Sequence, residues 1–260
     1  MRTMYFWQPA LALWEREVVR FLRQRNRIIG ALATPMIFWL LLGSGFNPSF
    51  RVPTGGDSVS YLAYFFPGSL ALIILFTAIF STISVIEDRR EGFLQGVLAA
   101  PVDPGAIVMG KLLGGTTLSI LQAAVFCALG PLAGLHFGFL QILMLLAAFT
   151  LMGFSLTGLG LMLAWPMDST QGFHAIMNVF LLPMWMLSGA MFPIPPESTV
   201  LYWISLCNPV SYGVTAIRAA FGSPADGVFS AYGIGMGVSA LFCAVMYAGC
   251  SLLVTKIRKV

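Results

Sequence analysis

The chain has 260 residues, of which 58% are hydrophobic and only 9% are charged. Soluble domains carry about 25% charged residues, so this composition, with a mean hydropathy of +0.87, excludes a soluble protein and predicts an integral membrane protein. The net charge of +4 does not indicate nucleic-acid binding, because the basic residues gather beside apolar segments.

The N-terminal segment 7–27 has the pattern of an amphipathic helix. Its apolar residues recur at helical spacing, while Arg16, Arg20, Arg23 and Arg27 fall largely elsewhere around the helix. We expect this helix to lie along the membrane surface, with its arginines toward anionic headgroups. A second interpretation, in which the same helix braces a soluble partner, stays open.

Uncharged runs predict six transmembrane helices, since about 20 apolar residues cross the hydrocarbon core of a bilayer. The predicted spans are 28–46, 62–86, 107–130, 138–165, 172–192 and 230–255, with a tight turn at 130–136 between the third and the fourth. The whole chain, 1–260, is then one membrane domain.

The segment 198–222 is the ambiguous one, because Asn208 and Pro209 interrupt its apolar run. Short cytoplasmic loops collect Lys and Arg. With six spans and both termini in the cytoplasm, 12 of the 14 basic residues are cytoplasmic, and only Arg51 and Arg218 lie outside. This distribution agrees with the rule better than the one that seven spans would give. We therefore predict that 198–222 forms a re-entrant or surface-lying helical hairpin on the outer side.

The loop 87–105, between the second and third spans, begins with the densest charge cluster of the chain, Glu87-Asp88-Arg89-Arg90-Glu91. A short helical stretch follows and is ended by Pro101, because proline breaks a helix interior. Leu94 and Leu98 contribute to an apolar side of this stretch. A helix with a charged end and an apolar side is suited to docking into a cleft of another protein; a solvated loop is the simpler alternative.

Most catalytic chemistry is missing from the sequence. The stretch Gly105 to Leu112 has the spacing of a nucleotide-binding P-loop, but Leu112 stands where Ser or Thr is required, and Gly110 and Gly114 fit a close helix contact better. Neither histidine has a partner at metal-ligand spacing. No charged residue is expected deep in a span, which argues against an ion-coupled transporter, and Lys111 and Asp168 are placed near span ends.

These features together resemble the permease subunit of the type-2 ABC exporters. The resemblance is carried by 87–101 followed by 107–111, and by 192–197, 206–212 and the pair Ile217-Arg218. It covers essentially the whole chain and is closest to the drug and lipo-oligosaccharide export branch.

The resemblance implies an all-α integral membrane fold: six transmembrane helices with an N-terminal amphipathic interface helix, a cytoplasmic coupling helix between spans 2 and 3, and an outer re-entrant hairpin before span 6. It implies a bacterial-type inner membrane, a second permease copy and two copies of a separate ATPase subunit, which binds ATP and Mg²⁺ while this chain binds no cofactor. The expected cargo is hydrophobic or amphipathic. The residues implied to couple the permease to the ATPase are Glu87, Asp88, Arg89, Arg90, Glu91, Leu98, Pro101, Arg16 and Glu17.

The substrate path is less defined by the sequence. Its candidate lining residues are Phe76, Phe80, Asn178, Phe180, Met184 and Trp185, with packing or lipid contact as the alternative for each. Asn178 is the strongest candidate, since a lone amide in a span requires a hydrogen-bond partner.

Two other functions remain as alternatives. A membrane-embedded lipid-modifying enzyme would need a polar cluster at one interface, for which the candidates are Asp57, His136, Glu197 and Asp226. A non-transporting membrane scaffold would have no ATPase partner.

Overall fold

The structure is a computed structural model that describes residues 2–46, 60–135, 137–194, 199–222 and 228–258. In these ranges the regular structure is helical and no strand occurs, which confirms the predicted all-α class. The helices are α1 (Arg2–Arg23), α2 (Arg25–Phe46), α3 (Tyr61–Ser81), α4 (Ile83–Arg90), α5 (Phe93–Ala99), α6 (Pro104–Cys127), η1 (Gly130–Ala133), α7 (Phe139–Ala164), α8 (Thr170–Met186), α9 (Thr199–Cys207), α10 (Pro209–Phe221) and α11 (Val228–Arg258).

Five stretches of the described chain are long and apolar enough to cross a membrane, and they lie in α2, in α3 with α4, in α6, in α7 and in α11. A sixth would be α9 with α10, if that pair, bent by 85°, is one span. The predicted fifth span corresponds to α8, which has 17 residues and is shorter than the others. It ends at Met186 and not at residue 192, because the chain turns at Gly189, whose φ of 77° is left-handed.

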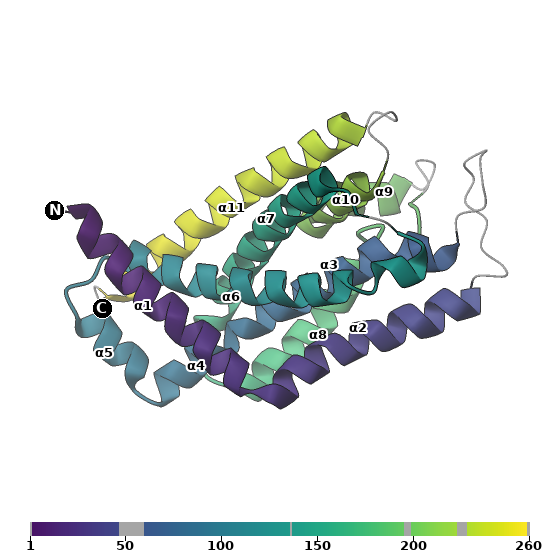
Figure 1. Ribbon diagram of the computed structural model, residues 1–260. Helices are drawn as coiled ribbons and strands as arrows, with labels where there is room; N and C mark the ends of the chain where they lie inside the picture. The colour runs from purple at the N-terminus through teal and green to yellow at the C-terminus, as the bar shows by residue number, and fades with distance from the viewer. Residues whose placement is uncertain (1, 47–59, 136, 195–198, 223–227, 259–260) are drawn as a thin grey trace.

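The long helices run back and forth along one bundle (Figure 1). Both chain ends and α5 lie toward one end of the bundle, while α9 and α10 lie together at the other. Asn208 sits at the bend between α9 and α10, where its side chain accepts a hydrogen bond from the Val210 amide at 3.0 Å. Pro209 occupies the first turn of α10, where its missing N–H costs nothing.

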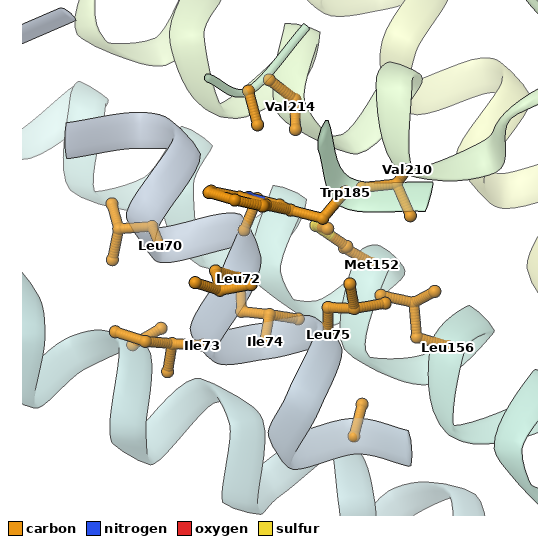
Figure 2. Packing of buried hydrophobic residues seen from close by; sticks show 14 of the residues in the cluster. Leu70, Leu72, Ile73, Ile74, Leu75, Met152, Leu156, Trp185, Val210 and Val214 are labelled. Carbon is orange, nitrogen blue, oxygen red and sulfur yellow. The ribbon is translucent and has the colours of Figure 1, made fainter. Parts of the chain in front are cut away.

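Helix α3 forms the centre of the bundle, and 89% of the most apolar 18-residue stretch of its span is buried. Figure 2 shows leucine and isoleucine side chains of α3 beside Met152 and Leu156 of α7. The ring of Trp185 lies between this layer and Val210 and Val214 of α10. By contrast, only 17% of the corresponding stretch of α2 and 28% of that of α11 are buried. Their exposed apolar faces are what a bilayer, as the surrounding solvent, would cover.

Helix α1 lies across α6 and runs at a steep angle to α2, which begins where α1 ends (Figure 1). Two glycines of α6 permit this contact: a Cβ on Gly110 would lie 2.6 Å from the Ala10 carbonyl oxygen, and one on Gly114 would lie 2.8 Å from the Glu17 Cβ. The close helix contact predicted for these glycines is therefore present. The helix begins at Arg2 and ends at Arg23, whereas the sequence suggested residues 7–27.

The charge cluster lies on a helix and not in a loop. The predicted second span ended at residue 86, but helical structure continues through α4 to Arg90. The reason is that the charged side chains find partners on α1 and α6, as described below. The connecting turn contains Gly92, whose φ is 78°, and α5 follows it. The short helix expected between the charge cluster and Pro101 is therefore present.

Candidate coupling site

Asp88 is the centre of a buried ion network. Its side chain is completely buried. One oxygen, Oδ1, accepts from Arg16 Nη2 at 2.7 Å and from Arg20 Nη1 at 2.9 Å, and the other, Oδ2, accepts from Lys111 Nζ at 2.5 Å. Asp88 therefore joins its own helix, α4, to two cations of α1 and one of α6.

Glu17 completes the network from α1. Its Oε1 lies 2.5 Å from Lys111 Nζ, and both side chains are almost fully buried. Lys111 also lies 3.3 Å from the Ser84 hydroxyl. Charges in a protein interior are tolerated when they are paired and hydrogen-bonded, and removing one partner leaves the other uncompensated. The three helices are therefore held in one arrangement by charges that depend on one another.

The outer part of the network reaches toward α5. Arg20 Nη2 lies 2.8 Å from Glu87 and 3.6 Å from Glu91. The Arg16 guanidinium lies 3.7 Å from the centre of the Phe93 ring, a cation–π contact with the first residue of α5. Burial by itself lowers the pKa of Arg16, but the hydrogen bond and charge of Asp88 outweigh it, and the pKa is raised.

The two arginines that end α4 hold the connection between α7 and α8. Arg89 donates to the Trp165 carbonyl and forms an ion pair with Asp168 at 3.2 Å. Arg90 Nε donates to the Asp168 carbonyl at 2.9 Å. The charge cluster thus contacts α1 and α6 on one side and the α7–α8 connection on the other.

Helix α5 has one face toward the protein and one toward solvent. Leu94 is buried and Leu98 is half-buried against the same apolar cluster. The exposed residues of this helix are Phe93, Gln95, Gly96 and Ala99, with Pro101 just beyond. The expectation that Leu98 and Pro101 shape the part that enters the ATPase stays a prediction, with Leu98 half-buried and Pro101 exposed.

Sequence reasoning missed Lys111 and Asp168, and it placed Arg20 on the interface helix without a coupling role. It placed Lys111 near a span end without a partner, and the structure shows that Lys111 is buried in the first third of α6. The available signal was that Lys111 is the one charged residue of that helix. A lone lysine in an apolar span requires a buried counter-charge.

The six candidate path residues do not lie together. Phe76, Phe80 and Asn178 line one cavity of about 330 Å³, with residues of α2 opposite them. Phe180 and Met184 line a different groove of about 680 Å³, beside Trp203 of α9. Trp185 lies in the core and donates to the Gly68 carbonyl at 2.8 Å. Trp185 is 2% exposed and lines neither cavity, so its place in the path stays a prediction that this structure does not support.

The polar set suggested for an enzyme, Asp57, His136, Glu197 and Asp226, lies outside the described residues. Within the part that the structure does describe, no three His, Cys, Asp or Glu side chains are placed to hold a metal ion.

A family model decides the identity of the chain. The model of the ABC-2 type transporter membrane proteins matches residues 9–221, which include the coupling site and the α9–α10 pair. The chain belongs to the ABC-2 type transporter family. The resemblance stated from the sequence is confirmed.

Several curated relatives of this ABC-2 protein carry transport or nodulation names. Nodulation protein J of Rhizobium meliloti is 26% identical over 238 residues, which cover 90% of this chain and 87% of the relative. The transport permease ycf38 of Cyanophora paradoxa is 25% identical over 83% of this chain and 75% of its own length. A third relative is YbhR of Escherichia coli K12, which is named a multidrug ABC transporter permease. It is 24% identical over 60% of this chain and 42% of its own length.

Proposed function

We propose that this ABC-2 protein is the permease of an exporter and that a separate ATPase subunit docks on α5. The observation that carries the proposal is the combination of an outward face on α5 with a buried ion network at its base. Gln95, Gly96 and Ala99 are exposed together with Phe93, which gives α5 a small mixed surface that a groove on a partner can enclose. Arg16, lying over Phe93, connects that surface to α1.

A movement of the docked ATPase that displaces α5 would be transmitted to the bundle through two sets of contacts. The first is α4, which continues α3 after a break at Thr82 and ends one turn before α5. The second is the contact of Arg89 and Arg90 with the α7–α8 connection. Since paired buried charges fix a discrete arrangement, the three helices α1, α4 and α6 would move as a unit.

The expected cargo is a hydrophobic or amphipathic molecule, such as a drug or a lipid-linked or lipo-oligosaccharide compound, taken from the cytoplasm or the inner leaflet. The cavity of about 330 Å³ between α2, α3 and α8 supports this class. Its walls are mostly apolar, with Phe76 and Phe80 on α3 and the amide of Asn178 on α8. A few polar groups in an apolar cavity are the usual composition of a small-molecule site.

The complete transporter would contain two permease copies and two ATPase copies, with ATP and Mg²⁺ bound by the ATPase. The chain would lie in a bacterial-type inner membrane with both termini in the cytoplasm. In support, both termini and α5 lie toward the same end of the bundle (Figure 1). The α9–α10 pair would then be a re-entrant hairpin on the outer side, and α1 an interface helix.

Site-specific photo-crosslinking tests this docking. A photoreactive amino acid replaces Gln95, which faces outward, or Leu98 of the same helix, which packs inward. We expect a cross-link from position 95 to a chain with nucleotide-binding motifs and none, or far less, from position 98. Equal yields at the two positions, or no ATPase captured by either, would contradict docking on α5.

A further inference from the structure

Another cavity, of about 430 Å³, lies at the end of the bundle that contains α9 and α10. The chain there contributes hydroxyl groups from α9, α10 and the turn after α8: Ser188, Ser205, Ser211 and Thr215. Of the described residues that line it, Arg218 alone is charged. None of the residues assigned above to coupling or to the substrate path contributes to this cavity.

Arg218 has contacts that hold it in place but none that neutralises it. Its Nη2 donates to the Gly189 carbonyl at 3.1 Å, and its guanidinium lies 4.2 Å from the centre of the Tyr64 ring. Among the residues that the structure describes, every ion pair involves other cations, and no carboxylate pairs with Arg218. Its Nε is buried and has no hydrogen-bond partner there.

A half-buried guanidinium without a counter-charge is an unfavourable arrangement. Desolvating a cation costs free energy that a nearby anion normally offsets. The Tyr64 ring supplies a weak attraction through its negative face, and carbonyl oxygens supply partial charges. Neither replaces a full negative charge, so an anion that enters the cavity would gain from both the charge and the unused N–H donor.

Among these hydroxyl groups the pair on α9 and α10 adds a donor, since Ser188 already donates to the Trp185 carbonyl at 2.6 Å and Thr215 to the Ser211 carbonyl at 2.8 Å. The Oγ atoms of Ser205 and Ser211 are 3.1 Å apart, so one donates to the other. The proton of the accepting hydroxyl then remains available for a further acceptor. The described residues that line the cavity include no carboxylate, so the charge that they supply is positive and favours an anion. Pro193, Ile194 and Val214 supply apolar wall, which suits the part of a molecule next to its headgroup.

We propose that this cavity binds the anionic oxyacid headgroup of an amphiphile, with Arg218 as the residue that recognises the charge. The shared chemistry is that of phosphate, sulfate or carboxylate. The proposal goes beyond coupling to an ATPase and does not depend on it, because binding can be measured on the purified permease alone.

The binding test uses the purified full-length chain in detergent and measures its melting temperature with three probes. These are phosphatidylglycerol, which is anionic, a glucosyl diacylglycerol, which is neutral, and inorganic phosphate. A ligand that binds the folded state raises the melting temperature according to its affinity. We expect phosphatidylglycerol to raise it more than the neutral lipid, and inorganic phosphate to have little effect.

Two variants show whether the effect arises in this cavity. Arg218→Gln removes the charge and should weaken the apparent affinity for phosphatidylglycerol by at least about tenfold. Thr215→Glu keeps Arg218 but places a carboxylate one turn before it on the same helix face, so the protein supplies its own anion. This variant should also lose the lipid effect, and it remains informative if Arg218→Gln does not fold.

The controls are Thr215→Gln, which has the same shape without the charge, and Lys256→Gln, which removes an exposed cation from the other end of the chain. Both should keep the phosphatidylglycerol effect. An unchanged effect in Thr215→Glu and in folded Arg218→Gln would overturn the proposal, as would equal stabilisation by the anionic and neutral lipids. A full effect of inorganic phosphate that depends on Arg218, with no gain from lipid, would overturn the assignment to an amphiphile.

Discussion

At the scale of single residues, the buried charges decide how the coupling site behaves. Asp88 accepts from Arg16, Arg20 and Lys111, and its side chain is completely buried. Asp168 is also an ion-pair partner, but its side chain is 87% exposed. An exposed pair gains little because water screens it, whereas a broken buried pair leaves a desolvated charge behind.

Asp88→Asn should therefore lower the free energy of unfolding by about 3–5 kcal/mol. The matched variant Asp168→Asn should cost less than about 1 kcal/mol, because its carboxylate stays in contact with solvent. Chemical denaturation of the purified variants in detergent measures both values. Similar losses for the two substitutions would show that burial does not set the strength of this network.

The sequence could indicate these charges but not their pairing. The cluster from Glu87 to Glu91 is visible as a run, and its importance was inferred from that density. Its partners Arg16, Arg20 and Lys111 are distant in the chain, and only the packing of α1 on α6 brings them to Asp88. Likewise, the position of Trp185 in the sequence cannot reveal that its indole N–H donates to the Gly68 carbonyl on α3.

At the scale of helices, the contact of α1 with α6 positions the network. The glycines Gly110 and Gly114 let the two backbones approach, and this is what brings Glu17 and Lys111 together. Such a small-xxx-small pattern was readable in the sequence. The points at which the helices end were harder to predict from the sequence. Helix α4 continues through charged residues, which are stabilised there by partners on other helices.

Gly110→Ala should displace α1 from α6, since the added methyl group would meet the Ala10 backbone and the Leu13 Cβ. We expect lower thermal stability and faster tryptic cleavage in α1, which carries Arg16, Arg20 and Arg23. The control is Gly233→Ala in α11, where a Cβ would meet no atom within 4 Å. That variant should keep or slightly raise stability, because alanine favours a helix more than glycine does. Equal behaviour of the two would contradict a close contact at Gly110.

At the scale of the whole molecule, the composition and the distribution of Lys and Arg predicted a helical membrane protein with both termini on one side. The structure confirms the helical class and places both termini toward one end of the bundle (Figure 1). The sequence could not predict that the six candidate path residues lie in two different cavities and in the core. The pattern of apolar residues along the chain is the same for a residue that lines a cavity and for one that packs in the core. The cavity near Arg218 was missed for the same reason, since its lining residues come from four separate segments.

Thiol labelling tests the sidedness of this arrangement. In a background without native cysteines, Leu132→Cys places a thiol on the η1 turn, where Leu132 is 71% exposed, and Gln95→Cys places one on α5. A membrane-impermeant reagent added to intact cells should label position 132, and position 95 only after the membrane is opened. Labelling of both positions from the same side would contradict the proposed orientation.

The central claim, that this permease works with a separate ATPase docked on α5, is tested most directly by purification of the tagged chain from native membranes. Mass spectrometry and ATP hydrolysis are then measured on the wild type and on Ala99→Arg, which changes only the outward face of α5. The account predicts about one ATPase subunit per permease with the wild type, and loss of both the subunit and the hydrolysis with Ala99→Arg, while the variant keeps its melting temperature. A wild-type preparation that is stable but has no nucleotide-binding subunit, or an ATPase retained equally by the variant, would contradict it.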